Sequence, residues 1–160
     1  MLDSLCGVGP ADIENLCAVI GRMFGVDRSG VGLLKVRGLT LEFVYPFALK
    51  SSGRIAVTSP AVAARTATTR KSELFNSFAN VSHNSVFELV PLADCTRAAD
   101  PLRIQKLMTA PVLDSNKAIG VIQIARKGTN PDEAGPDFTE QDMEKLNRIA
   151  QRIAPFLINF

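Results

Sequence analysis

The stretch LMTAPVLDSNKAIGVIQIARK, residues 107–127, decides the fold. It holds most of two apolar-rich runs, 104–113 and 118–127, which are separated by the polar residues 114–117. Short apolar runs joined by a polar four-residue turn are typical of an antiparallel β-hairpin. The sequence therefore predicts two neighbouring antiparallel strands in the last third of the chain.

A long helix, 139–158, is predicted after the hairpin. Thr139 can act as its N-cap, and Asp142 three residues later resembles the second member of a capping box. Phe138 before the cap can pack on Met143 as a hydrophobic staple. Apolar residues then recur at spacings of three and four, which gives the helix a continuous apolar side. These residues are Met143, Leu146, Ala150, Ile153 and Leu157.

The chain before the hairpin predicts a first helix, 10–24, and two strands, 31–37 and 39–47. Apolar residues alternate along the second strand, so we expect them to line one surface of the sheet. These residues are Leu39, Leu41, Phe43, Tyr45 and Phe47. Shorter predicted elements follow: a strand at 54–58, a helix at 61–70, an edge strand at 73–77, a helix at 81–89 and a loop at 91–101. This order of elements predicts an α+β fold built on an antiparallel sheet.

Composition limits the classes of protein to consider. The chain has 160 residues, a net charge of +2 and 46% hydrophobic residues, as expected of one globular domain, 1–160, with an N-terminal extension at 1–9. The small, unclustered positive charge disfavours a nucleic-acid partner. The longest apolar-rich run, 118–125, is too short to cross a membrane, and no signal peptide is visible. Three cysteines without a CxxC pair predict free thiols and a cytoplasmic location.

Three motifs in the second half resemble the GAF domain family. They are Ala110-Pro111-Val112 at a strand end, Ile119-Gly120-Val121-Ile122-Gln123 after the turn, and Phe138-Thr139-x-x-Asp142 at the last helix. The segment SPAVAARTATTRKSELFNS, 59–77, looks like the family's small-residue helix and the short strand that follows it. The resemblance covers residues 11–160 and implies a five- to six-stranded, profilin/PAS-related sheet. It places the N- and C-terminal helices on one face and short helices and loops over the other.

The resemblance also implies a small-molecule pocket under the short helices and loops, and terminal helices that pair in dimers. Cyclic-nucleotide-binding members carry a signature that Lys127, Phe138 and Asp142 match, but Arg126 and Met143 depart from it. Cyclic nucleotide binding is therefore disfavoured. Lys127 and Asp142 are expected to form a structural clasp between a strand and the last helix.

No catalytic constellation is visible in the sequence. Some members of the family reduce free methionine sulfoxide through a reactive thiol. Their Gly-Val-Cys-Gly-like motif is absent, so Cys95 is the alternative nucleophile, while the helical spacing of Cys17 from Ile13 favours packing. Thr96 stands where bilin-binding members commonly have His after the attachment cysteine. His83 is the sole histidine and cannot form a metal site alone, so no metal and no identified cofactor are expected.

The expected ligand site combines an apolar strand face with a lid at 91–103, in which Arg97 and Arg103 would meet an anionic group. The residues assigned to it are Phe43, Tyr45, Phe75, His83, Phe87, Arg97 and Arg103. The wide apolar side of the last helix, together with the first helix, predicts a homodimer. The residues assigned to this interface are Ile13, Ile20, Leu146, Ile149, Ile153 and Phe156.

The sequence thus favours a non-enzymatic sensory or regulatory domain that binds a small ligand or a protein partner. Helix-mediated dimerisation would carry its signal to a separate output protein. Two alternatives remain open: a thiol-based redox enzyme using Cys95, and a dimerisation scaffold without a ligand.

Overall fold

A six-stranded antiparallel sheet forms the centre of the molecule. The computed structural model describes residues 10–49, 54–78 and 103–159. The strands lie in the order β3-β2-β1-β6-β5-β4, with antiparallel pairing throughout. Their bounds are Val31–Arg37 (β1), Thr40–Tyr45 (β2), Arg54–Ala56 (β3), Glu73–Phe75 (β4), Arg103–Asp114 (β5) and Lys117–Gly128 (β6). The sheet confirms the predicted fold class.

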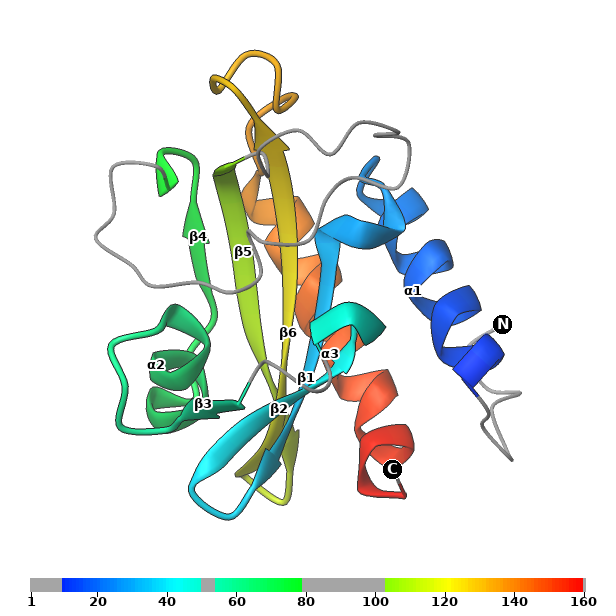
Figure 1. The fold of residues 1–160 in the computed structure, drawn as a ribbon, viewed down its shortest axis with the longest axis vertical. Coiled ribbons are helices and arrows are strands. Elements are labelled where there is room, and N and C mark those ends of the chain that lie inside the picture. Colours follow the sequence, from blue (N-terminus) through cyan, green and yellow to red (C-terminus); the bar gives the residue numbers. More distant parts are fainter. Residues whose placement is uncertain (1–9, 50–53, 79–102, 160) are drawn as a thin grey trace.

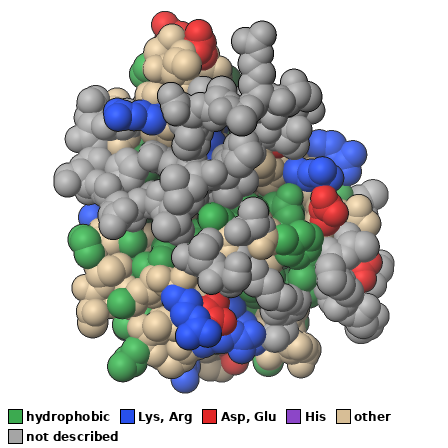
Figure 2. Space-filling model, in the orientation of Figure 1, with side chains coloured by type: hydrophobic (Ala, Val, Ile, Leu, Met, Phe, Trp, Pro, Cys, Tyr) green, Lys and Arg blue, Asp and Glu red, His purple; other side chains and the backbone are tan. Residues whose placement is uncertain are grey.

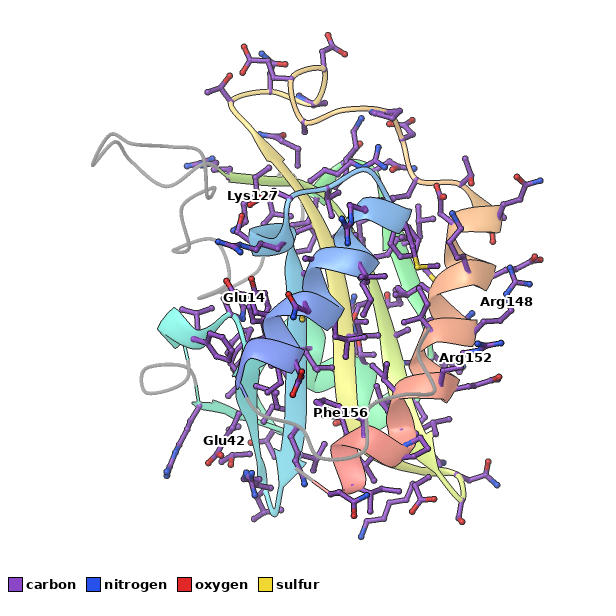
Figure 3. The ribbon with its side chains drawn as sticks, turned by 90° about the vertical axis from the view of Figure 1, so that its right-hand side faces the viewer. Glu14, Glu42, Lys127, Arg148, Arg152 and Phe156 are labelled. Carbon is purple, nitrogen blue, oxygen red and sulfur yellow. The ribbon has the colours of Figure 1, made fainter. Side chains whose placement is uncertain are left out.

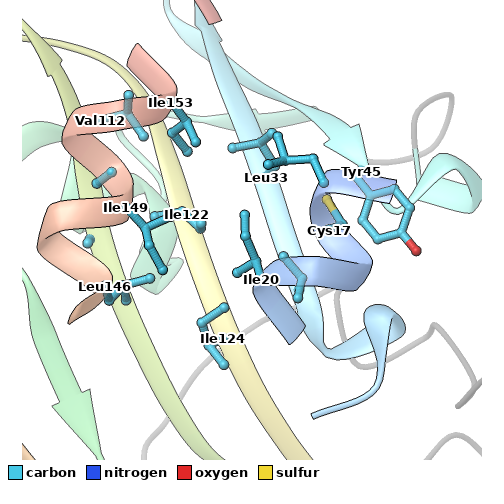
Figure 4. Close-up of a cluster of buried hydrophobic side chains, with 14 of the residues drawn as sticks. Cys17, Ile20, Leu33, Tyr45, Val112, Ile122, Ile124, Leu146, Ile149 and Ile153 are labelled. Atoms are coloured by element: carbon cyan, nitrogen blue, oxygen red, sulfur yellow. The ribbon is translucent and has the colours of Figure 1, made fainter. Parts of the chain in front are cut away.

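The helices divide between the two faces of the sheet, as expected. Helices α1 (Pro10–Met23) and α3 (Glu140–Ile158) lie on one face, and α2 (Val62–Thr69) lies on the other (Figure 1). Each face has its own core of buried apolar side chains. Figure 4 shows part of the first core, where Ile20 from α1 and Ile153 from α3 surround Ile122 of β6. We call these faces the α1/α3 face and the α2 face.

The hairpin that decides the fold is present, and its strands are longer than predicted. Strands β5 and β6 have 12 residues each. Ser115 and Asn116 at the turn have left-handed φ values of 49° and 66°, the conformation of a tight hairpin turn. Strand β6 pairs with β1 on its other side, so the hairpin occupies the middle of the sheet.

Helix α3 begins as the sequence predicts. The Thr139 hydroxyl accepts a hydrogen bond from the backbone N–H of Asp142 (3.2 Å). The Asp142 carboxylate accepts one from the N–H of Thr139 (2.9 Å), so both members of the capping box are present. The predicted helix at 81–89, the loop at 91–101 and the extension at 1–9 lie outside the described residues.

The prediction that five alternating residues of the second strand line one surface is wrong. Leu41 and Phe43 belong to the core of the α2 face, whereas Tyr45 belongs to that of the α1/α3 face. Pairing shifts from Leu34↔Phe43 to Leu33↔Tyr45, which leaves Val44 as an extra residue, a β-bulge. A bulge exchanges the faces of the residues beyond it. The outer two residues, Leu39 and Phe47, are exposed.

Candidate functional site

A row of polar and small residues crosses four strands on the α2 face. Gly32 of β1 pairs with Gln123 of β6, Gln123 pairs with Thr109 of β5, and Thr109 pairs with Glu73 of β4. Directly paired residues of antiparallel strands share a face. The strand neighbours of Gln123 and Thr109 pack into the opposite core, which places this row on the α2 side. We call these four residues the polar row.

Hydrogen bonds join the polar row to α2. The Gln123 amide nitrogen donates to the Thr109 hydroxyl (3.4 Å), which lies 2.9 Å from the Thr66 hydroxyl. Thr66 donates to the Val62 carbonyl oxygen (2.9 Å), so the Thr109 hydroxyl is the donor to Thr66. Each hydroxyl proton is therefore used once. Within the described residues, the Gln123 carbonyl oxygen and its second N–H form no further hydrogen bond.

Apolar rows lie on both sides of the polar row. Phe75, Leu107 and Ala125 are paired across β4, β5 and β6 on one side. On the other side, Phe43, Leu34 and Val121 are paired across β2, β1 and β6. Such a mixture of apolar walls and a few placed polar groups is typical of small-molecule sites. Figure 2 views the molecule from this side and shows hydrophobic side chains among the polar ones.

The outer end of the polar row is held by an ion pair. Arg65 of α2 donates two hydrogen bonds to the Glu73 carboxylate, at 2.7 and 2.9 Å. Such a two-bond arrangement fixes the relative orientation of the two groups. The guanidinium carbon of Arg65 also lies 5.8 Å from the ring centre of Phe75. Helix α2 is thereby attached to the edge of the sheet as well as to its centre.

The predicted ligand residues separate into four groups. Phe43 and Phe75 lie on the α2 face, next to the polar row. Tyr45 lies in the opposite core because of the bulge, so its assignment to this face is wrong. Arg103 is exposed at the start of β5. His83, Phe87 and Arg97 lie outside the described residues, as do Cys95 and most of the predicted lid.

The expected Lys127–Asp142 clasp is assigned to the wrong side chain. Lys127 pairs with Ile104, a core residue of the α2 face. Figure 3 shows Lys127 on the side of the sheet away from α3. Its neighbour Arg126 instead reaches the segment before α3. The Arg126 guanidinium donates to the carbonyl oxygens of Pro136 (2.5 Å) and Phe24 (2.7 Å).

Two further contacts fix the segment before α3. Arg126 lies over the ring of Phe138, 4.4 Å from its centre. Burial lowers the pKa of the Arg126 guanidinium, and the charges of Asp142 and Asp137 oppose this shift. Lys106, which pairs with Arg126 on β5, donates to the Gly135 carbonyl oxygen (2.6 Å) and forms an ion pair with Asp137 (2.8 Å). Arg126 of β6 and Lys106 of β5 therefore attach the sheet to the segment before α3, the role that was expected of Lys127.

The six residues assigned to a dimer interface are all buried within one chain. Each has at most 8% of its surface exposed, and all belong to the core of the α1/α3 face. Packing against the sheet therefore accounts for the apolar side of α3. These side chains are not the surface that a second copy would contact, and dimerisation itself stays a prediction.

Cys17 is packed in the core, as its helical spacing predicts. It has 0% of its surface exposed, and burial together with the charge of Glu14 raises the pKa of its thiol to about 12. The described part of the chain contains no cluster of three or more acidic, histidine or cysteine residues able to hold a metal ion. None of its helices is both long and apolar enough to span a bilayer.

Sequence reasoning did not assign Thr66, Thr109 or Gln123 to the site. A signal was present, because Gln123 and Thr109 are polar residues inside apolar strand segments, IQIA and LMTA. Strand alternation places both on one face, which could have suggested a polar centre there. The contribution of Thr66 depends on how α2 is placed, and the sequence does not show this.

Comparisons with known proteins agree with the architecture. The structure is similar to the GAF domain of a phosphoenolpyruvate-protein phosphotransferase from Coxiella burnetii (TM-score 0.69, 8% identity, 94% of this chain and 83% of that chain). It is similar to the A. aeolicus nlh2 GAF domain in an inactive state (TM-score 0.67, 14% identity, 97% and 88%). It is also similar to the type II free methionine-R-sulfoxide reductase of Thermoplasma acidophilum (TM-score 0.62, 13% identity, 94% and 93%).

These identities show a shared fold alone. No curated protein sequence matches the chain. The GAF domain family model, however, matches residues 13–155, which include most of both terminal helices and every described strand. With the sheet order and the division of helices between its faces, this match means that the chain belongs to the GAF domain family.

Proposed function

We propose that this chain is a sensory or regulatory GAF domain that binds a small molecule on the α2 face, next to Gln123. The polar row between two apolar rows is the observation that supports this most directly. The opposite face has an apolar core along its centre, whereas this face offers a buried amide beside a glycine, which adds no side chain of its own. GAF domains generally have sensory and regulatory roles, which agrees with this proposal.

The chemistry of the row indicates the kind of ligand. A flat apolar part would lie against the rows that contain Phe43 and Phe75. A polar edge that both donates and accepts hydrogen bonds would match the carbonyl oxygen and second N–H of the Gln123 amide, which bond to no other described residue. A neutral planar molecule with an amide-like edge fits this description better than a multiply charged one.

A thermal-shift screen against nucleobases, nucleosides, amino acids, oxoacids and tetrapyrroles tests the proposal. A ligand that binds the folded state raises Tm by mass action. Gln123→Leu should abolish the shift, and Gln105→Leu is the matched control. Gln105 is an equally buried amide, 5% exposed like Gln123, but it donates to the Gly128 carbonyl oxygen. A screen without any shift would favour the scaffold alternative, and equal losses in both variants would contradict the assigned site.

We propose a non-enzymatic role, and the redox enzyme is the alternative. The reductase among the similar structures keeps this question open. Cys17 is buried with a raised pKa, so thiol chemistry would depend on Cys95 or Cys6. Turnover of free methionine sulfoxide that is lost in Cys95→Ser would replace our proposal with the enzyme. A sensor should ignore that substitution.

We also propose that the domain is cytoplasmic, forms a homodimer and acts on a separate output protein. The outward side of α3 is the surface we assign to the dimer. It carries Glu140, Glu144, Arg148 and Arg152, all exposed and spaced four residues apart. Figure 3 shows Arg148 and Arg152 pointing away from the sheet. Two antiparallel copies of α3 would bring the acidic half of one helix opposite the basic half of the other.

A further inference from the structure

The segment 72–76, which contains edge strand β4, divides its side chains between helices on opposite faces of the sheet. Glu73 and Phe75 point to the α2 face, and Leu74 packs against the core of the α1/α3 face. Ser72 and Asn76 bond to α3 or to the residue just before its cap. This follows from the two-residue period of a strand. We propose that this segment couples α2, and hence the proposed ligand site, to the start of α3.

The contacts with α2 are charge-assisted. Arg65 holds the Glu73 carboxylate through two hydrogen bonds of 2.7 and 2.9 Å and lies over Phe75. Glu73 is also the outer residue of the polar row, paired with Thr109. A shift of α2 on the sheet would therefore move Glu73 with it.

The contacts with α3 lie on either side of β4. The Ser72 hydroxyl donates to the Asn147 side-chain oxygen (2.5 Å). The Asn76 amide bonds twice to the backbone of Phe138, accepting from its N–H (2.8 Å) and donating to its carbonyl oxygen (3.1 Å). Phe138 directly precedes the N-cap and lies under Arg126, which also holds the end of α1. A displacement of segment 72–76 would therefore change contacts at the start of α3 and, through Phe138 and Arg126, contacts at the end of α1.

The position of β4 at the sheet edge lowers the free-energy cost of such a displacement. It is a three-residue strand at the edge of the sheet, and among the described strands it pairs with β5 alone. A small shift alters few backbone hydrogen bonds, whereas the same shift of a central strand would disturb two ladders. This inference rests on the proposed function for its biological meaning but not for its test.

Hydrogen–deuterium exchange of the intact chain, without ligand, tests the coupling. Arg65→Met removes the two hydrogen bonds to Glu73 of β4. Because Arg65 does not bond to α3, any effect of this variant on α3 must pass through β4. We expect amide exchange over residues 140–147 to quicken by about three- to tenfold. Arg70→Met is the matched control, because Arg70 at the end of α2 donates to the Asn116 carbonyl oxygen (2.9 Å) and not to β4. It should leave exchange in α3 unchanged.

Two further measurements separate coupling from loss of stability. General destabilisation would quicken exchange equally in the middle of β6, so coupling requires a larger change in α3 than in β6. Ser72→Ala combined with Asn76→Ala removes both links to α3 and should itself quicken exchange at the start of α3, and adding Arg65→Met should then have little further effect. Unchanged exchange over 140–147 in Arg65→Met, or equal changes in α3 and β6, would overturn the proposal. Failure of the ligand screen would leave this result untouched.

Discussion

At the scale of single residues, Cys17 and Tyr45 predict how stability depends on alkaline pH. Burial is the main cause that raises the pKa of each to about 12, from 9.0 for the thiol and 10.0 for the phenol. The unfolded chain loses these protons at lower pH than the folded chain, so deprotonation favours unfolding. The stabilising contribution is complete below about pH 9 and is lost as pH rises toward 12.

Urea denaturation between pH 7 and 10.5 measures this effect. The free energy of unfolding should begin to fall near pH 9. Cys17→Ala should make the decline shallower, because the alanine has no proton to lose. Val112→Ala, in the same core but not titratable, is the control and should lower stability equally at every pH. Parallel curves for the parent chain and Cys17→Ala would contradict the prediction.

Residue-scale predictions succeed where the interaction is local in sequence. Thr139 and Asp142 form the predicted capping box because they are three positions apart, a spacing that the geometry of a helix start brings into hydrogen-bond distance. The partner of Lys127 depends on which face its strand presents, and a bulge between Ile104 and Lys106 adds to that difficulty. Alternation places Lys127 on the same face as Gln123, but no residue near Lys127 indicates which face α3 covers.

At the scale of elements, the absence of a side chain at Gly120 allows α3 and β1 to pack closely against β6. A β-carbon at this position would lie 2.5 Å from the Leu34 carbonyl oxygen and 2.6 Å from Leu157 Cδ1. Gly120→Ala should therefore lower the free energy of unfolding by about 1–3 kcal/mol, as overpacking does. Urea denaturation measures it.

Gly38→Ala is the control for Gly120→Ala. Gly38 has a φ of 61° but nothing within 4 Å of a β-carbon, so only the left-handed backbone is penalised, by about 1 kcal/mol. A smaller loss at Gly120 than at Gly38 would show that the elements separate easily at this point. That result would be inconsistent with the tight packing described above.

Element positions were largely predictable because hydrophobic period and turn residues act over a few neighbours. The strand 31–37 has the predicted bounds, and the hairpin strands differ by one residue at each end. The face of each side chain was less predictable, since the single extra residue Val44 exchanges the faces of β2. The polar row needs four strands in register, which no local pattern encodes.

At the scale of the whole molecule, the charges of α3 predict salt-sensitive pairing of two copies. Glu140, Glu144, Arg148 and Arg152 form no ion pair with any other residue of the described chain. Exposed ion pairs contribute about 0.2–1 kcal/mol each, so a dimer held by them should weaken as salt rises. Sedimentation velocity at low and high salt measures this.

Charge exchange sharpens the same prediction. A variant with both glutamates changed to arginine, and one with both arginines changed to glutamate, should each be monomeric alone. Mixed together, they should form a heterodimer, because the acidic and basic helices are again complementary. Arg70→Glu, on the α2 face, should leave association unchanged. A parent chain that stays monomeric at every concentration and salt level would contradict the assigned surface.

The bulge at Val44 has a consequence for how the molecule loses its structure. Before the bulge, β2 supplies Leu41 and Phe43 to one core, and after it Val44 and Tyr45 to the other. A sheet with separate cores on its two faces could melt one layer at a time, but a strand shared in this way removes side chains from both when it detaches. Heating should therefore produce one calorimetric transition, with equal calorimetric and van't Hoff enthalpies.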